Sequence, residues 1–260
     1  MKLGYVGLGK IGSVMVERLL ERRHEVVVFD TDDEVMQRVV WKGAIKAQSL
    51  WSLVGLLERP RLVWLMIPHE QVDAVLTDMV PLLHDGDTII DGSNSLYKDS
   101  VRRAEELAKR EIQFLDAGVS GGSEGAREGA CVMVGGAEKV FKKFEPLFRD
   151  IAAENGYLHA GSTGAGHFAK MVHNDIEYGM ARSIADGFEV LKQSSYEFDL
   201  AKIARLYNHK SDIEARMVGW LQLAYETYGE DLKEAAEGSL KYSDKVLSAL
   251  RGELGGREIS

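Results

Sequence analysis

"LGYVGLGKIGS", residues Leu3–Ser13, begins with an apolar run typical of a β-strand and continues into a glycine-rich turn. The turn "GLGKIG" carries Gly7, Gly9 and Gly12, and residues of helical spacing follow it. In turns of this form the first glycine bends the chain, the second lets a pyrophosphate approach the backbone, and the third lets the helix pack on the strand. The stretch therefore predicts a strand, a turn and a helix that together bind a dinucleotide.

Six further runs of apolar or β-branched residues follow, and segments of helical spacing separate them. The expected strands are Leu3–Val6, Glu25–Phe29, Leu62–Ile67, Thr88–Asp91, Phe114–Asp116, Cys131–Val134 and Tyr157–His159. Strands that alternate with helices predict an α/β fold with a doubly wound, mainly parallel sheet of Rossmann type. Ligands of such sheets bind at the carboxyl ends of the strands, so the turns after the strands are the first candidates for a site.

The character of the sequence changes after "GSTGAGHF" (Gly161–Phe168). No further strand-like run appears, and the stretches "EARMVGWLQLAYETYG" and "EAAEGSLKYSDKVLSALRG" have the spacing of helices. We therefore expect a dinucleotide-binding domain over residues 1–162 and an all-helical domain over residues 163–260. Residues 165–192 are long enough to form the central helix of the second domain.

The composition limits the classes of partner. Among 260 residues, 41 acidic side chains exceed 32 basic ones, and the net charge of −9 argues against nucleic acid or an anionic membrane as the main partner. The single cysteine, Cys131, cannot form an intrachain disulfide and favours a reducing compartment. No apolar run approaches the ~20 residues of a membrane-spanning helix, and the strand at Leu3 leaves no room for a signal peptide, so we expect a cytoplasmic protein. The histidines show no spacing typical of metal ligands, and we expect no metal.

Asp30 ends the second expected strand, where a carboxylate can accept hydrogen bonds from both ribose hydroxyls of NAD. A carboxylate there would repel the 2′-phosphate of NADP, and "FDTDDE" (Phe29–Glu34) contains no arginine. NAD is therefore favoured, with NADP as the alternative cofactor. A second interpretation makes Asp30 a cap of the following helix, a role that Thr31 or Asp32 could serve equally well.

Two polar stretches follow later strands, "DGSNSLYKDS" (Asp91–Ser100) and "DAGVSGGSEGA" (Asp116–Ala126). In the second stretch, Ser120, Gly121 and Gly122 would bring backbone amides and a hydroxyl close to an anionic or hydroxylated ligand. The alternative is that both stretches are simply strand-to-helix turns rich in Gly, Ser and Asn.

The stretch "KMVHNDIEYG" (Lys170–Gly179) concentrates polar groups on one side of the expected central helix. At about 100° per residue, its polar side chains fall within about 80° of Lys170 on the helical wheel. These residues are Lys170, His173, Asn174, Glu177 and Tyr178. Val172, Ile176 and Gly179 point the other way, and we expect them to face a core. The alternative is a solvated face with a Lys–Glu pair, but a lysine base and a glutamic acid on one face suit a two-step proton transfer.

With these residues assembled, the chain resembles a short form of 6-phosphogluconate dehydrogenase (decarboxylating), within the β-hydroxyacid dehydrogenase superfamily. The resemblance runs from Leu3 to about Glu230 through four motifs in order: "GLGKIG", "DTIIDGSNSLYKDS", "VSGGSEGAREG" and "GAGHFAKMVHNDIEYGM". Other β-hydroxyacid dehydrogenases share the glycine turn, the Ser-Gly-Gly segment and the lysine with an asparagine four residues later. They lack the His-Asn and Ile-Glu-Tyr pairing, which therefore separates the subfamilies.

The resemblance implies a role for each matching residue. Lys170 would take the proton of the C3 hydroxyl as hydride leaves for the nicotinamide, CO2 would be lost, and Glu177 would protonate the enediol to give ribulose 5-phosphate. The expected cofactor residues are Gly7, Leu8, Gly9, Lys10, Ile11, Gly12, Asp30, Met66 and Asn94. The expected substrate residues are Asn94, Ser120, Gly121, Gly122, His173 and Asn174, with Tyr178 and Arg216 at the phosphate. The family also implies a homodimer with interlocked helical domains.

The sequence departs from the family pattern at two places. Thr31 stands where NADP-dependent members usually carry a basic residue, which agrees with a preference for NAD. The family's Gly/Ser-rich turn that ends in Trp-Thr has no counterpart in "YSDKVLSALRGELGGREIS" (Tyr242–Ser260), so we expect a shortened substrate and dimerisation domain in which Lys241 or Lys245 could replace lost positive charge. Two alternatives stay open: a non-decarboxylating β-hydroxyacid dehydrogenase, or a weakly active homologue that binds NAD or a sugar acid.

Overall fold

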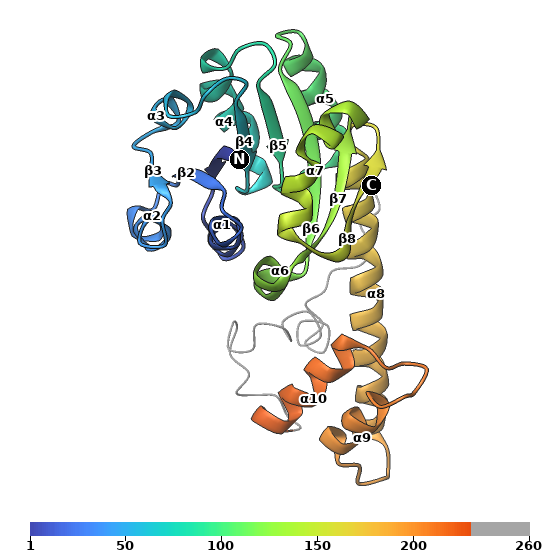
Figure 1. Ribbon diagram of the computed structural model, residues 1–260. Coiled ribbons are helices and arrows are strands. Elements are labelled where there is room, and N and C mark those ends of the chain that lie inside the picture. The colour runs from blue at the N-terminus through green and yellow to red at the C-terminus, as the bar shows by residue number, and fades with distance from the viewer. Residues whose placement is uncertain (230–260) are drawn as a thin grey trace. The chain divides into compact units, whose positions relative to one another are not determined.

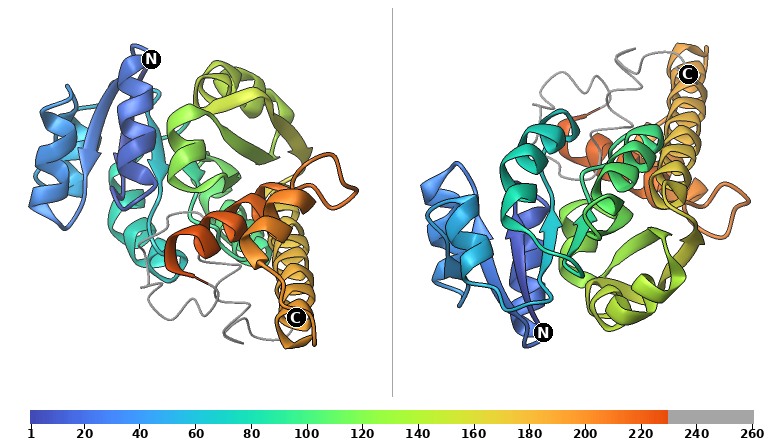
Figure 2. Two further views of the ribbon diagram at one scale, coloured as in Figure 1. Left: turned by 90° about the horizontal axis from the view of Figure 1, so that it is seen from below. Right: turned by 90° about the horizontal axis from the view of Figure 1, so that it is seen from above.

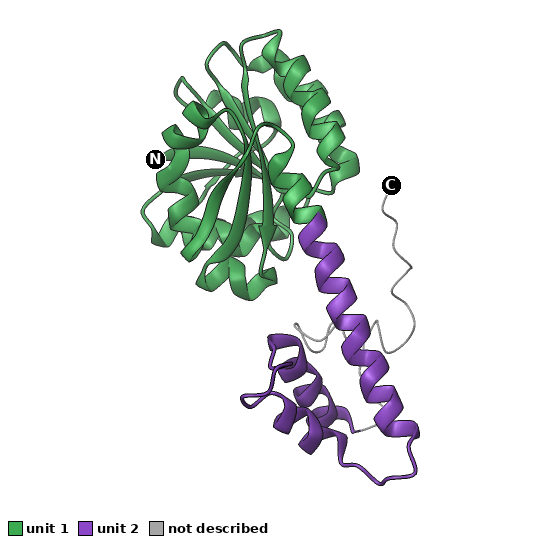
Figure 3. Ribbon diagram, turned by 90° about the vertical axis from the view of Figure 1, so that its right-hand side faces the viewer, with its two compact units in different colours: residues 1–171 green, residues 172–260 purple. Residues whose placement is uncertain are grey.

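The computed structural model describes residues 1–229, and the chain divides into two compact units, residues 1–171 and 172–260 (Figure 3). Three predictions lie outside the described residues: the helix around "EAAEGSLKYSDKVLSALRG", the role of Lys241 or Lys245, and the departure from the family pattern at Tyr242–Ser260. The division between the units falls within one helix, because its first turns pack on the sheet of unit 1. The sequence had placed a domain boundary between residues 162 and 163, just before that helix begins.

Unit 1 is built on one eight-stranded sheet in the order β3-β2-β1-β4-β5-β6-β7-β8 (Figure 1). The strands are β1 (Lys2–Val6), β2 (Glu25–Phe29), β3 (Ile45–Lys46), β4 (Leu62–Leu65), β5 (Thr88–Asp91), β6 (Gln113–Ser120), β7 (Ala130–Gly136) and β8 (Ala152–Gly161). Neighbouring strands run parallel except for the antiparallel pair β6 and β7. The predicted α/β fold with a doubly wound, mainly parallel sheet is confirmed.

Helices cover both faces of this sheet (Figure 2). They are α1 (Gly12–Glu21), α2 (Asp33–Val40), α3 (Leu50–Gly55), α4 (Val72–Met79), α5 (Tyr97–Ala108), α6 (Gly122–Glu128) and α7 (Glu138–Ile151), with short 3-10 helices at His69–Gln71 and Val80–Leu82. The core on one face receives residues of α1, α2, α6 and α7, and the core on the other receives residues of α3, α4 and α5. Strands buried on both faces read as continuous apolar runs, which is why the sequence revealed them.

The strand order fixes the position of the ligand crevice. The chain passes from β1 to β2 on one side, whereas β4 pairs with β1 on the other side. In open sheets of this kind, ligands bind where the order reverses, beside the carboxyl ends of the strands. The crevice therefore lies at the ends of β1 and β4, where the glycine turn and Met66 follow. The two-residue strand β3 was not predicted, and β6 extends to Ser120 through residues that the sequence had suggested as a turn.

Over residues 172–229, unit 2 consists of helices joined by short loops and contains no strand. Helix α8 (Ala165–Gln193) begins in unit 1 and continues into unit 2, where α9 (Leu200–Tyr207) and α10 (Arg216–Tyr228) follow it. A hydrophobic cluster that starts at Ala181 and Ala185 of α8 joins these helices through residues such as Leu200 and Leu221. The predicted central helix and the predicted helix around Arg216 are confirmed.

Candidate active site

The glycine turn after β1 has the geometry that a dinucleotide requires. Gly7 has φ +97°, and a side-chain carbon there would lie 2.3 Å from the Met66 main-chain oxygen. A side-chain carbon on Gly12 would lie 2.2 Å from the Gly7 oxygen, so both positions exclude any larger residue. Gly9, in contrast, has no described atom within 4 Å of such a carbon, and its backbone is open to a ligand. The turn therefore fits a pyrophosphate that contacts main-chain amides at the start of α1.

Asp30 faces this turn from the end of β2. Its Oδ2 accepts a hydrogen bond from the Leu8 amide at 2.6 Å, and its Oδ1 accepts one from the Asp32 amide at 3.0 Å. Asp32, rather than Asp30, caps α2 by accepting from the Glu34 amide at 2.9 Å. The capping interpretation of Asp30 is therefore wrong, and its carboxylate is held beside the glycine turn. Lys10 and Ile11 complete the turn, with Lys10 exposed and Ile11 half-buried.

The turn after β5 carries Asn94 in a left-handed conformation, with φ 57°. Asp91 lies beneath it and accepts hydrogen bonds from the Ser93 amide at 3.0 Å and from the Ser95 hydroxyl at 2.8 Å. The buried Arg103 guanidinium donates to Asp91 at 3.2 Å and to Ser95 at 2.7 Å. A non-glycine residue with positive φ persists where surrounding contacts enforce it. These contacts hold the exposed Asn94 side chain at the carboxyl end of β5.

Helix α8 begins against a buried carboxylate of β6. Asp116 is fully buried, and its two oxygens accept hydrogen bonds from the Gly164 amide at 2.7 Å and the His167 amide at 2.8 Å. A negative charge at a helix N-terminus is stabilised by the unpaired amides and the helix dipole. Asp116 therefore fixes where α8 starts and how its first turn meets the sheet.

Glycines bring the first turns of α8 onto the sheet backbone. A side-chain carbon on Gly118 of β6 would lie only 2.4 Å from Lys170 Cβ. One on Gly166 would lie 2.5 Å from the main-chain oxygens of Asp116 and Met133. Lys170 is consequently buried where α8 packs on β6, with only 5% of its surface exposed. Gly118 and Gly166 were not among the predicted site residues, although the glycines of "DAG" and "GAG" are typical of close backbone approach.

The expected base lies against β6, the strand that leads into the Ser-Gly-Gly segment. Side chains two residues apart in a strand share a face, so Asp116, Gly118 and Ser120 line the face of β6 on which α8 begins. Ser120 therefore lies one step beyond the contact with Lys170. Gly121 follows with φ +118°, where an L side chain would be strained. Gly122 then opens α6 with φ +60°, and an added side-chain carbon there would meet open space, so its backbone is accessible.

The remaining polar residues of the stretch lie on the part of α8 that belongs to unit 2. His173, Asn174 and Glu177 are half-buried, and His173 Nδ1 lies 3.8 Å from Glu177 Oε2. The expectation that Val172 and Ile176 face a core is wrong, since they are 41% and 59% exposed. Val172 and Ile176 precede the hydrophobic cluster of unit 2, whose first residue is Ala181. Residues 172–180 belong to none of the hydrophobic clusters found in residues 1–229.

The two expected phosphate ligands are exposed residues of unit 2. Tyr178 lies on α8 and is 42% exposed. Arg216 is the first residue of α10 and is also exposed. Their roles stay predictions, as do those of the other expected substrate residues.

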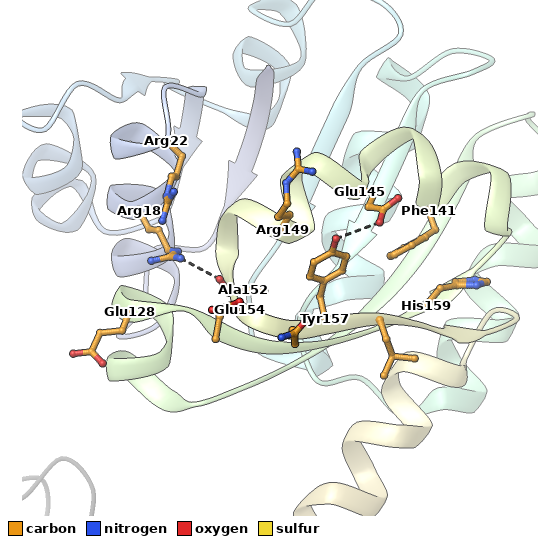
Figure 4. Close-up of a pocket in the computed structure, with 13 residues that line it drawn as sticks. Arg18, Arg22, Glu128, Phe141, Glu145, Arg149, Ala152, Glu154, Tyr157 and His159 are labelled. Carbon is orange, nitrogen blue, oxygen red and sulfur yellow. Dashed lines mark hydrogen bonds between the residues drawn. The ribbon is translucent and has the colours of Figure 1, made fainter.

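A cavity of about 670 Å³ opens elsewhere on unit 1, between α1, α7 and β8, and contains none of the expected site residues (Figure 4). Arg18 at its edge donates to the main-chain oxygens of Asp150 at 2.8 Å, Arg127 at 2.8 Å and Ala152 at 3.1 Å. These oxygens lie at or near the C-terminal ends of α6 and α7, which attract a cation. Burial lowers the pKa of Arg18 below its usual value. The Arg18 guanidinium therefore holds α1 against the ends of α6 and α7, and its positive charge stabilises this packing.

Residues 1–229 contain neither a membrane-spanning helix nor a cluster of metal ligands. No helix there is long and apolar enough to cross a bilayer. No group of three or more His, Cys, Asp or Glu side chains in the same range has an arrangement that would hold a metal ion.

Comparison with known proteins finds similarity to 6-phosphogluconate dehydrogenases and to a 3-hydroxyisobutyrate dehydrogenase. Residues 2–161 match the family model described as the NAD binding domain of 6-phosphogluconate dehydrogenase, and residues 166–235 match the model of its C-terminal domain. YqeC of Bacillus subtilis, named only provisionally as a 6-phosphogluconate dehydrogenase, is 48% identical over 225 residues, which cover 86% of this chain and 76% of that one. The NAD(+)-dependent decarboxylating 6-phosphogluconate dehydrogenase of Haloferax volcanii is 38% identical over 234 residues, covering 89% and 77%. Among solved structures, a Mycobacterium tuberculosis 3-hydroxyisobutyrate dehydrogenase determined with L-serine has a TM-score of 0.70 and 25% identity, covering 84% and 72%.

Proposed function

The chain belongs to the 6-phosphogluconate dehydrogenase family, as its motifs indicated, and we propose that it oxidatively decarboxylates 6-phosphogluconate to ribulose 5-phosphate and CO2 with NAD. Membership of this family makes the chain an oxidoreductase with an NAD(P)-binding domain, related to the β-hydroxyacid dehydrogenases. Decarboxylation and the preference for NAD are our proposal. The observation that carries it is the buried Lys170 beside Gly118, on a helix that presents Glu177 seven residues later.

The residues of unit 1 fit the cofactor. The backbone of Gly7–Gly12 would hold the pyrophosphate, and Asp30 would accept hydrogen bonds from the adenosine ribose. Met66 and Asn94 follow β4 and β5 and would border the bound nucleotide on the crevice side. When bound, NAD supplies the acceptor for the hydride. The carboxylate beside the glycine turn supports NAD over NADP, because a 2′-phosphate would bring a second negative charge to Asp30.

The proton transfers belong to Lys170 and Glu177. Lys170 takes the proton of the substrate's C3 hydroxyl as the hydrogen on C3 departs as hydride. The resulting 3-keto acid loses its carboxylate as CO2, because the electrons of the C1–C2 bond can move toward the ketone oxygen, to which Lys170 returns its proton. Glu177 then protonates the enediol at the carbon that becomes C1 of ribulose 5-phosphate, while Lys170 takes back the proton of the C3 hydroxyl so that the ketone forms. Burial of Lys170 where α8 meets β6 excludes bulk water from the base.

The remaining expected residues would hold the substrate. The oxygens of the sugar acid are assigned to Asn94, Ser120, Gly121, Gly122, His173 and Asn174, and the phosphate to Tyr178 and Arg216. Within unit 1, the positive φ of Asn94 and the glycine-rich start of α6 support this assignment, since both present polar groups at strand ends. These roles can be tested one residue at a time.

The test measures both products. Purified protein with 6-phosphogluconate and NAD should form NADH and CO2 in equal amounts. NADH without CO2 would move the chain to the non-decarboxylating β-hydroxyacid dehydrogenases, a second candidate supported by the likeness to 3-hydroxyisobutyrate dehydrogenase. Calorimetric binding of NAD without turnover of any sugar acid would leave only a binding homologue.

A homodimer is part of the same proposal. Val172, Ile176 and Met180 form an exposed apolar row at intervals of four residues on α8, with 41%, 59% and 45% of their surfaces accessible. Such a row is a common feature of subunit interfaces. Light scattering after size-exclusion chromatography should give about twice the chain mass of 28.8 kDa, and Ile176→Glu should lower it. A monomer at assay concentration would refute this part alone.

A further inference from the structure

His167 is a buried histidine to which no proposed step has yet given a role. It lies in the first turn of α8, three residues before Lys170, and is 2% exposed. Its main-chain amide donates to Asp116, and its ring Nδ1 lies 2.7 Å from the Ser100 hydroxyl of α5. Its Nε2 is buried and forms no hydrogen bond of normal geometry with any residue in the described range. A buried polar atom of this kind calls for an explanation.

Charged groups from three elements surround the ring. Burial is the largest effect and lowers the pKa of His167, the carboxylates of Asp91 and Asp116 act to raise it, and Arg103 acts to lower it further. The net direction is downward, so the ring is neutral at neutral pH. The main-chain oxygen of Asp91 also lies near enough to favour a protonated ring, although it forms no hydrogen bond of normal geometry with Nε2. His167 therefore lies beside Asp91 at the end of β5 and Asp116 in the middle of β6 as an uncharged polar group.

The contact with Ser100 supplies something that the glycine contacts do not. Gly118 and Gly166 let α8 approach the sheet closely, but contact with a flat backbone gives little resistance to rotation of the helix about its own axis. A hydrogen bond is directional and weakens steeply when its angle changes. Together with the hydrogen bonds from the Gly164 and His167 amides to Asp116, the bond between His167 and Ser100 therefore fixes the rotation of the first turns of α8. Lys170 is about 60° away on the same helix and turns with it.

The same helix α5 also supports the turn that carries Asn94. Arg103 of α5 binds Asp91 and Ser95 beneath that turn, and Ser100 lies one helical turn before Arg103. Through Ser100, α8 is therefore attached to the element that fixes Asn94. Rotation of α8 would change the direction of Lys170 relative to this turn.

We propose that His167 is a positioning residue, whose ring holds Lys170 in the orientation needed for proton transfer through its hydrogen bond to Ser100. The inference rests on the proposed role of Lys170 as the base. His167 itself touches no reacting atom in this proposal. What matters is a polar group at this position that bonds Ser100, with no added positive charge next to the lysine.

The first test compares two substitutions. His167→Phe keeps a buried ring but removes the bond to Ser100, whereas His167→Gln keeps a neutral polar group that can reach the hydroxyl. With 6-phosphogluconate deuterated at C3, His167→Phe should lower kcat at least tenfold, leave KM for NAD within twofold and raise the isotope effect on kcat. His167→Gln should restore kcat to within threefold of the wild type. Equal activity of the two variants, or a wild-type kcat in His167→Phe, would overturn the proposal.

A second test does not depend on turnover. Labelling of Lys170 by pyridoxal 5′-phosphate and borohydride, followed by mass spectrometry, reports the lysine's accessibility and direction, with the exposed Lys202 as internal reference. His167→Phe should change the relative rate at least threefold. Val39→Ala, a buried substitution on α2, is the control for general destabilisation. It should lower the melting temperature and leave the relative labelling rate of Lys170 unchanged. If the wild type oxidises no 6-phosphogluconate but the labelling still changes as expected, the proposed function fails and the role of His167 stands. If turnover is present and neither kcat nor labelling responds to His167→Phe, the role of His167 fails alone.

Discussion

Gly118→Ala offers a sharp test of how the base is held. The added methyl carbon would lie 2.4 Å from Lys170 Cβ and 2.8 Å from the Gly166 main-chain oxygen, whereas ordinary contact begins at 3.4 Å. The helix and strand must therefore separate by about 1 Å at this point, since the backbone on one side cannot yield. A displacement of about 1 Å at a catalytic group costs on the order of 10²-fold in rate. Overpacking of this kind also costs about 1–3 kcal/mol of stability.

The assay separates these two effects. We expect kcat for 6-phosphogluconate oxidation to fall about 100-fold, while the Kd for NAD, measured by calorimetry, stays unchanged because the added methyl group contacts Lys170 and Gly166 of α8 and not the glycine turn. Gly187→Ala on the same helix is the matched control, since nothing described lies within 4 Å of its added carbon. That control should retain activity and gain slight stability from helix propensity. A Gly118→Ala enzyme with kcat within threefold of the wild type would refute the reasoning.

Three other predictions concern single side chains. Lys170→Met should lower kcat by about 10²–10⁴-fold without changing the affinity for NAD, and unchanged turnover would refute its role as the base. Asp30→Ser should raise the ratio of kcat/KM for NADP to that for NAD by about tenfold, which corresponds to ~1.4 kcal/mol of lost repulsion, and an unchanged ratio would contradict the assignment. A hydrogen bond from Arg103 is the main cause that lowers the pKa of Asp73 from 3.8 to about 2. Because the folded-state pKa is below the unfolded value, this carboxylate stabilises the fold above pH 3.8, and the benefit is lost as the pH falls through about 2. Asp73→Asn should therefore lower the free energy of unfolding in urea near pH 6, and a deficit that persists at pH 2 would contradict this.

The fold could be predicted because its signals are local. The run Leu3–Val6 with the glycine turn specified the first β-α unit, and strands buried on both faces gave continuous apolar runs. The strand β3 escaped because two residues give no periodicity. The extension of β6 to Ser120 escaped because its Gly and Ser resemble turn residues, yet pairing with β7 keeps them in the sheet.

The candidate site was predictable where one element carries it and not where several elements meet. Helical spacing alone placed Glu177 on the same face of α8 as Lys170. Sequence could not reveal that Asp116 caps that helix, because the two are joined only through tertiary contact. It also misassigned Ile176, since an apolar residue opposite a polar face predicts a core only when a core lies on that side.

The two halves of the proposed reaction rest on different kinds of observation. For the oxidation, contacts within unit 1 fix the base: Asp116 caps α8, Gly118 admits Lys170, and burial shields it. For the protonation that follows decarboxylation, Glu177 rests on helical spacing and its 3.8 Å approach to His173 in unit 2. Release of NADH and CO2 without enzyme-catalysed protonation of the enediol would therefore refute the role of Glu177 while leaving that of Lys170 intact. Loss of both products would point instead to the contact between α8 and β6.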